Sequence, residues 1–79
     1  MLISLRSLDK GILYEEEASS LNVKTTSGEI TILNHHRPLM TELEQGDVVI
    51  TNSNGSVRRF GTLGGFLEVN QNKAIVLLD

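Results

Sequence analysis

The 79-residue chain lacks cysteine entirely, has one proline, and contains no long apolar run. Without cysteine it can form no disulfide, no thiolate metal site and no cysteine nucleophile. No segment approaches the ~20 apolar residues that a membrane-spanning helix needs, and the first residues lack a basic region followed by an apolar segment. We therefore expect a soluble chain that does not insert directly into a membrane.

Aromatic and basic side chains are also scarce. Tyr14, Phe60 and Phe66 are the three aromatic residues, too few to stack a run of nucleic-acid bases. Seven basic and ten acidic side chains leave a formal net charge of −3, whereas sequence-independent binding to nucleic acid normally requires a basic face. The composition therefore argues against a nucleic-acid partner.

Catalytic motifs are missing as well. There is no Gly-x-Ser-x-Gly elbow. The glycine-rich residues 61–65 lack the Lys-Ser/Thr ending and the following helix of a phosphate-binding loop. A chain this short also buries only roughly 60% of its unfolded surface, which leaves little room for a water-excluding pocket. We expect no catalytic residue and no cofactor.

What the chain does contain is an apolar pattern of period two, typical of strands with one buried and one exposed face. Turn residues separate these runs about every 8–12 positions, as in a sandwich or barrel. Residues 14–21 carry no helical stripe. The sequence predicts a single all-β domain over residues 1–79 with about eight to ten short strands. The clearest alternating runs are 21–25, 29–33, 39–43 and 47–51.

Short segments carry further structural predictions. The Asn54-Gly55 pair predicts a hairpin, because both residue types tolerate positive φ. Gly64 and Gly65 predict a bulge or a close backbone approach within a strand. The acidic residues 15–17 are typical of a solvated edge strand or loop that discourages edge pairing. Arg58 and Arg59 are expected on opposite faces of a strand, one in solvent and one paired with a carboxylate or a partner subunit.

His35 and His36 are the obvious candidates for metal ligands. Neighbouring residues of a strand point to opposite faces, so the two could share an ion only in a loop. No carboxylate stands at a ligand spacing from them. We predict that the site binds no metal and that the histidines serve the loop or a partner. A small metal-dependent enzyme using both histidines is the less favoured alternative.

Two blocks of residues form a recognisable pattern. The first block consists of Gly28, Glu29, Ile32, Leu33, His36, Pro38, Leu39, Thr41, Leu43 and Gly46, and the second of residues 64–69 and 74–79. Together they resemble the N-terminal β-domain of the epsilon subunit of F-type ATP synthases, called delta in mitochondria. The resemblance covers essentially the whole chain. Thr31 stands where that family usually has Gly, and Asn34-His35 where it commonly has Pro-Gly, which leaves the conformation of residues 34–38 open.

The resemblance implies a flattened sandwich of about ten strands that acts as a non-catalytic central-stalk subunit. Such a subunit couples ion-driven rotation of the membrane ring to ATP synthesis or hydrolysis. It implies that Glu29 faces the polar loops of the c-ring and that His36 and Thr41 face the gamma subunit. It also implies a peripheral location on the cytoplasmic face of the cell membrane, or on the matrix or stromal face in an organelle.

Family members generally continue into a C-terminal helical hairpin. From the resemblance we expect a truncated or naturally hairpin-less form here. The alternative function, from another class, is a stand-alone small β-barrel that binds an oligonucleotide or a sugar. That alternative would require exposed aromatics or a basic groove, which the composition does not favour.

Overall fold

The computed structural model describes all residues from Met1 to Asp79 and contains nine β-strands and no helix. This confirms the all-β prediction, and nine strands lie within the eight to ten expected from the turn spacing. The strands are β1 (Leu2–Ser7), β2 (Gly11–Glu17), β3 (Ser20–Thr25), β4 (Gly28–Leu33), β5 (Leu39–Leu43), β6 (Gly46–Thr51), β7 (Val57–Thr62), β8 (Gly65–Asn70) and β9 (Lys73–Leu78).

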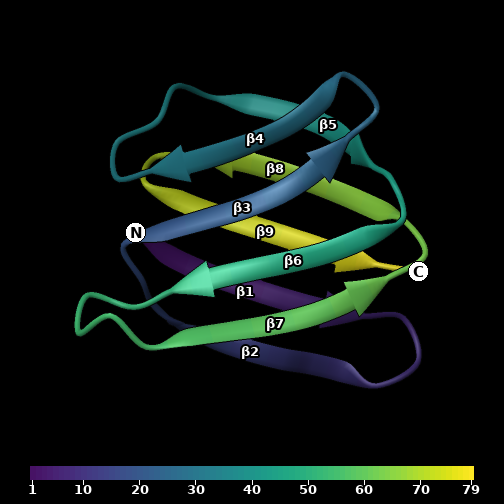
Figure 1. Ribbon diagram of the computed structural model, residues 1–79, viewed down its shortest axis with the longest axis horizontal. Coiled ribbons are helices and arrows are strands. Elements are labelled where there is room, and N and C mark those ends of the chain that lie inside the picture. The colour runs from purple at the N-terminus through teal and green to yellow at the C-terminus, as the bar shows by residue number, and fades with distance from the viewer.

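The strands form one sheet that curls into two layers (Figure 1). Its strand order is β2-β1-β9-β8-β5-β3-β6-β7, and β4 pairs with β3. We call β2, β1, β9, β8 and β5 the five-stranded layer, and β4, β3, β6 and β7 the four-stranded layer, which lies in front in Figure 1. The layers share one ladder contact, Thr25 opposite Leu43. The molecule measures 27 × 25 × 19 Å, a flattened sandwich.

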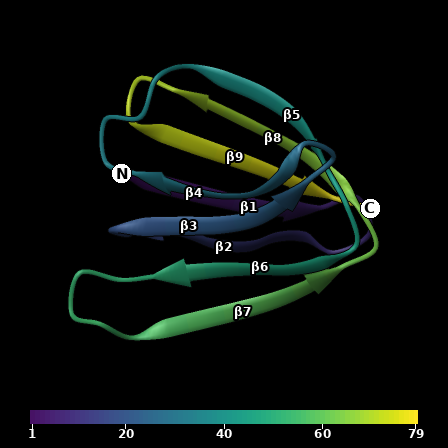
Figure 2. The same cartoon turned by 45° about the horizontal axis from the view of Figure 1, so that its top comes forward.

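Four of the strand pairings follow from short connections. Consecutive strands pair antiparallel in four hairpins: β1–β2, β3–β4, β6–β7 and β8–β9. Strands that are distant in the sequence also pair antiparallel: β3 with β5 and β6, and β5 with β8. The one parallel pairing is that of β1 with β9, which joins the two ends of the chain in the middle of the five-stranded layer. Figure 2 shows β1 and β9 beneath β5 and β8 and apart from β6 and β7.

A single cluster of 16 buried apolar residues fills the space between the layers. The predicted alternation is confirmed: Leu21, Val23 and Thr25 are buried, whereas Lys24 between them is exposed. Strand side chains alternate between the two faces, so the inward residues of both layers meet in one core. The largest fully buried side chains are Ile3, Leu5, Leu21, Ile32, Ile50 and Leu67.

The turns use residues that accept positive φ. Gln71 and Asn72 have φ of 49° and 56° and form the two-residue turn between β8 and β9, the geometry that suits the right-handed twist of a hairpin. The hairpin predicted at Asn54-Gly55 is confirmed between β6 and β7. Its connection spans residues 52–56, and Gly55 alone has a positive φ, 88°.

The prediction for the glycine pair is half right. Gly64 lies in the connection between β7 and β8, and Gly65 is the first residue of β8, so neither is a bulge within a strand. The close approach is confirmed, because a Cβ on Gly65 would overlap the backbone carbonyl oxygen of Leu77. The register irregularity of the sheet lies elsewhere, at Leu5 and Arg6 of β1.

Both charged segments fall on the strands at the ends of the sheet. The acidic residues 15–17 end β2, which pairs only with β1, so the edge-strand prediction is confirmed. Arg59 of β7 stands opposite Val49 of β6, while Arg58 faces the other way. Neither arginine forms an ion pair within the chain, and Arg58 packs on aromatic rings. Pairing with a partner subunit stays a prediction.

Candidate partner-binding site

The connection between β4 and β5 carries His36 in an ordered loop. His35 adopts a left-handed conformation with φ of 64°, and its backbone N–H donates to Asn72 Oδ1 at 2.8 Å. The N–H of His36 donates to the carbonyl oxygen of Leu33 at 3.2 Å. His36 Nδ1 lies 2.7 Å from the carbonyl oxygen of Arg37. The loop therefore reaches positive φ without glycine and is tied to the β8–β9 turn.

His36 and Thr41 line one groove. It has a volume of about 370 Å³ and lies between β4 and β5; we call it the β4–β5 groove. Ile30 and Leu39 are half-buried against the core and supply apolar lining, while His36 and Thr41 are half-buried and polar. Thr25, Ser27 and Met40 complete the lining. A groove of this kind can hold an apolar side chain and offer hydrogen bonds around it.

Glu29 does not line this groove. It is exposed on β4, next to the inward-facing Ile30 and opposite Lys24 of β3 in the register. Its carboxylate forms no ion pair with Lys24 or with any other residue. The structure thus separates the three predicted site residues into the groove pair His36–Thr41 and the solitary carboxylate of Glu29 on the outer face of the four-stranded layer.

No three His, Asp or Glu side chains gather closely enough to hold a metal ion. Burial raises the pKa of Tyr14 above 10.0, and the Glu16 carboxylate raises it further. Arg58 and the hydrogen bond to Asn52 oppose this shift in the pKa.

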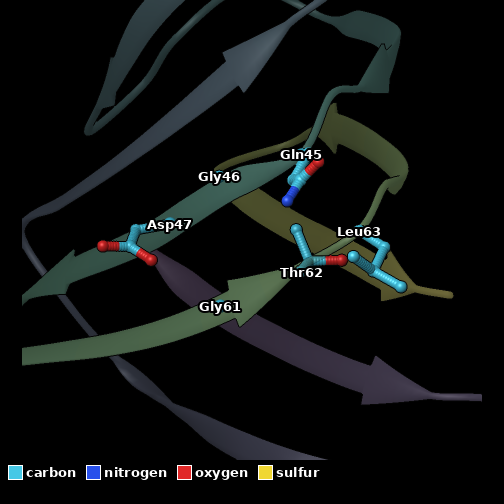
Figure 3. Close-up of a pocket in the computed structure, with 6 residues that line it drawn as sticks. All are labelled: Gln45, Gly46, Asp47, Gly61, Thr62 and Leu63. Atoms are coloured by element: carbon cyan, nitrogen blue, oxygen red, sulfur yellow. The ribbon is translucent and has the colours of Figure 1, made fainter.

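A second hollow lies where β6 begins and β7 ends (Figure 3). Its volume is about 340 Å³. In Figure 3, Gln45 and Thr62 stand at one end of the hollow and Asp47 at the other, while Leu63 projects outward. The lining brings together one carboxylate, one amide and one hydroxyl, without a histidine or a cation.

Sequence reasoning missed an exposed apolar row on the outer face of the five-stranded layer. Phe66 of β8 pairs in register with Leu77 of β9, and each is 39% exposed. Leu77 is in turn opposite Arg6, which is opposite Ile12 of β2. Met40 of β5 is also exposed on this layer. The alternating pattern places Phe66, Leu77 and Met40 outward, whereas Ile12 faces outward because the register shifts between it and the buried Tyr14. Only the strand order, which joins distant segments, sets these residues side by side.

Sequence reasoning also missed an aromatic cluster between β2 and β7. Tyr14 and Phe60 pack edge to face, with ring centroids 6.1 Å apart. The Arg58 guanidinium lies over both rings. Tyr14 and Asn52, which are hydrogen-bonded, stand 38 residues apart in the chain, so no local pattern could have found the cluster.

These features define a class of protein. A small curled β-sandwich with surface hollows and exposed apolar side chains is suited to binding other macromolecules.

The chain belongs to the family of the ATP synthase delta/epsilon chain β-sandwich domain, whose model matches residues 8–79. This confirms the resemblance seen in the residues, and it agrees with the sandwich architecture.

Proteins similar to this chain carry the matching name. A protein of Desulfitobacterium hafniense (strain DSM 10664 / DCB-2), named ATP synthase epsilon chain, is 40% identical over 70 residues, which cover 89% of this chain and 52% of that protein. One of Corynebacterium efficiens with the same name is 36% identical over 78 residues, covering 98% of this chain and 62% of that protein. The chain thus spans roughly half to three fifths of the length of these curated relatives.

Two solved structures share the fold. A chain in the Euglena gracilis mitochondrial ATP synthase (OSCP/F1/c-ring, rotational state 1) superposes with a TM-score of 0.91 at 23% identity, covering 99% of this chain and 49% of that one. A chain in the central stalk/c-ring structure of the Tetrahymena thermophila mitochondrial enzyme superposes with a TM-score of 0.80 at 24% identity, covering 99% and 62%. At these identities the likeness establishes the fold.

Proposed function

We propose that this chain is the β-sandwich part of a non-catalytic central-stalk subunit of an F-type ATP synthase. In this role it couples ion-driven rotation of the c-ring to ATP synthesis or hydrolysis by binding both the gamma subunit and the ring. The observation that carries the proposal is the family match over residues 8–79, together with relatives of up to 40% identity named ATP synthase epsilon chain.

The separation of the predicted site residues supports two different contacts. The half-buried pair His36 and Thr41 lines the β4–β5 groove; we assign this pair to the gamma subunit. Glu29 projects from β4 as an exposed carboxylate without an ion pair; we assign it to the polar loops of the c-ring. Because the Glu29 carboxylate has no ion pair in the free domain, it can pair with a basic group on assembly without breaking an existing ion pair.

The remaining parts of the proposal concern the unit and its location. Residues 1–79 are proposed to fold as one domain, which the single core cluster between the two layers supports. The structure holds no helix long and apolar enough to cross a membrane. We propose a peripheral position on the cytoplasmic face of the cell membrane, or on the matrix or stromal face in an organelle.

The ring contact is tested with Glu29→Gln, which keeps the size of the side chain and removes its charge. Binding to the purified c-ring should weaken about twofold to fivefold at low salt, the range of an exposed ion pair, and less at high salt. The control is Glu68→Gln, an exposed carboxylate on the five-stranded layer. Equal losses for the two variants, or a lower melting temperature with unchanged ring binding, would contradict the role of Glu29.

The gamma contact is tested with His36→Ala and Thr41→Ala, measured by calorimetric titration with the gamma subunit. Both variants should bind more weakly, whereas Thr31→Ala, which removes an exposed hydroxyl from the outer face of β4, should bind normally. Stoichiometric zinc in the purified domain that disappears in His36→Ala would instead favour the metal-dependent alternative.

The whole function is tested by reconstitution. A cognate enzyme stripped of this subunit should regain ion-coupled turnover when the 79-residue chain is added. Failure to restore coupling despite normal folding would overturn the coupling role. Co-purification of an oligonucleotide or a sugar would favour the stand-alone binding module.

A further inference from the structure

The curled sheet does not close into a barrel. Its hydrogen-bonded path ends at β2 on one side and at β7 on the other. Each of these strands pairs with one neighbour only, β2 with β1 and β7 with β6. Both strands run along the same side of the sandwich in Figure 1. We call the boundary between them the seam, and no backbone ladder crosses it.

Four side chains bridge the seam, and we call them the clasp. Tyr14 of β2 is 5% exposed, and its Oη donates to Asn52 Oδ1 at 2.7 Å. The rings of Tyr14 and Phe60 pack edge to face, with an interplanar angle of 66°. The Arg58 guanidinium carbon lies 5.7 Å from the Tyr14 centroid and 5.3 Å from the Phe60 centroid. The hydrogen bond, the edge-to-face ring pair and the cation–π contacts are all attractive, so together they link β2 to the β6–β7 hairpin.

Arg58 has no other partner that would account for its position. It forms no ion pair with any carboxylate. The next residue, Arg59, lies on the opposite face of β7 beside Val49 and also lacks an ion pair. The two neighbouring arginines thus carry the same charge on opposite faces of β7, and of the two only Arg58 touches the rings at the seam.

The hydrogen-bonding groups on the free edges of β2 and β7 make the seam a weak point. Unpaired strand edges invite pairing with other chains, and inward-pointing charged residues are one way in which proteins prevent this. Local opening of a folded protein proceeds through its least stable units. Beyond the end of β2, the backbone N–H of Ser19 donates to the carbonyl oxygen of Thr51 at 2.8 Å. Along β2 and β7 themselves no backbone ladder joins the strands, so side chains oppose such opening there.

We propose that Tyr14, Asn52, Arg58 and Phe60 act as a clasp that holds β2 and β7 together, and that the sandwich opens locally by parting these two strands. In this device Arg58 is a positioning residue that keeps both rings covered. The clasp does not depend on the stalk role, since it rests only on contacts within this chain.

The test is native-state amide hydrogen exchange on the whole chain, with Arg58→Met and Arg59→Met as a matched pair. Each variant removes one positive charge from β7 and keeps an unbranched side chain. For Arg58→Met we expect amides in both β2 and β7 to exchange about threefold to fivefold faster, because the cation–π contacts of an exposed arginine with two rings are lost. Amides of β3 and β8 should be unchanged, and Arg59→Met should change all strands by less than about twofold.

Tyr14→Phe provides a second measurement that does not depend on Arg58. It removes the hydrogen bond to Asn52 and keeps the ring, so exchange in β2 and in the β6–β7 hairpin should rise by about threefold to tenfold. In the double variant Tyr14→Phe/Arg58→Met, the exchange rate should rise by less than the product of the two single-variant increases, because both substitutions promote the same local opening.

Three results would overturn the clasp. Faster exchange in β7 with β2 unchanged would mean that the two strands open independently. Equal effects of Arg58→Met and Arg59→Met would indicate a general charge effect. Uniform acceleration in every strand would show that the sandwich unfolds as a whole and has no separate opening at the seam.

Discussion

Gly65 is the position where the structure makes the sharpest demand on the sequence. It pairs with Leu78 at the start of the β8–β9 ladder, and a Cβ placed on it would overlap the carbonyl oxygen of Leu77. The same Cβ would lie 3.2 Å from the Leu77 carbonyl carbon and 3.2 Å from the Leu78 Cα. All three neighbours are backbone atoms of a strand in the middle of the sheet, so none can rotate away.

The substitution Gly65→Ala should therefore be expensive for so small a change. Forcing a methyl group into a packed region costs about 1–3 kcal/mol. The φ of +155°, which residues with a Cβ rarely adopt, adds strain of about 1–3 kcal/mol. Together these terms predict a loss of at least about 2 kcal/mol in the free energy of unfolding, or at least about 8 °C in melting temperature for a domain of this size.

Urea denaturation and thermal melting measure this directly, with Gly61→Ala as the control. A Cβ on Gly61 would have only Asp47 Oδ1 as a neighbour, at 3.8 Å, an ordinary contact, and its φ is not in the strained range. The control should stay within about 0.5 kcal/mol of the parent. If Gly65→Ala lost less than about 1 kcal/mol with an unchanged denaturant slope, the close approach of β8 to Leu77 would be refuted.

Three further predictions concern stability. Leu67→Ala should lower the free energy of unfolding by about 2–5 kcal/mol, because Leu67 is fully buried; Met40→Ala, at a side chain 65% exposed, should change it by less than about 0.5 kcal/mol in the same denaturation experiment. Because burial and Glu16 raise the pKa of Tyr14, the only tyrosine, the native state keeps the phenol proton after the unfolded chain has lost it. Stability from this group should be complete below pH 10.0 and fall as the pH rises from there through the native pKa, and alkaline titration of Tyr14→Phe should lack this decline. Gln71→Gly should raise stability by about 0.5–1 kcal/mol, since glycine accepts the φ of 49° without strain; a lower melting temperature would contradict this.

The strands themselves were predictable from the residues. Along residues 21–25 the apolar side chains stand two apart, and consecutive strand residues point to opposite faces whichever strand lies beside them. The pattern therefore indicated which side chains would be buried before any partner strand was known. The hairpin around Asn54 and Gly55 was also predictable, because the φ preference of a turn residue is a local property.

Of the site residues, the exposure of Glu29 followed from its place on the strand, but the relation among the three residues did not. His36 and Thr41 come together because β4 and β5 flank one groove, and Ile30 contributes to it from β4. The loop between these strands depends on a hydrogen bond from His35 to Asn72, a residue in another hairpin. Such long-range contacts leave no periodic signal in a single sequence.

The residues by themselves thus determined the strand class, the inward and outward faces and several turns, because these depend on side-chain direction and local φ preferences. Only the tertiary structure decided the parallel pairing of β1 with β9, the contact of Gly65 with Leu77, and the meeting of Tyr14 with Arg58 at the seam. The physical reason is that backbone N–H and C=O groups are the same in every strand, so pairing specificity comes from how the whole set of side chains packs in one core.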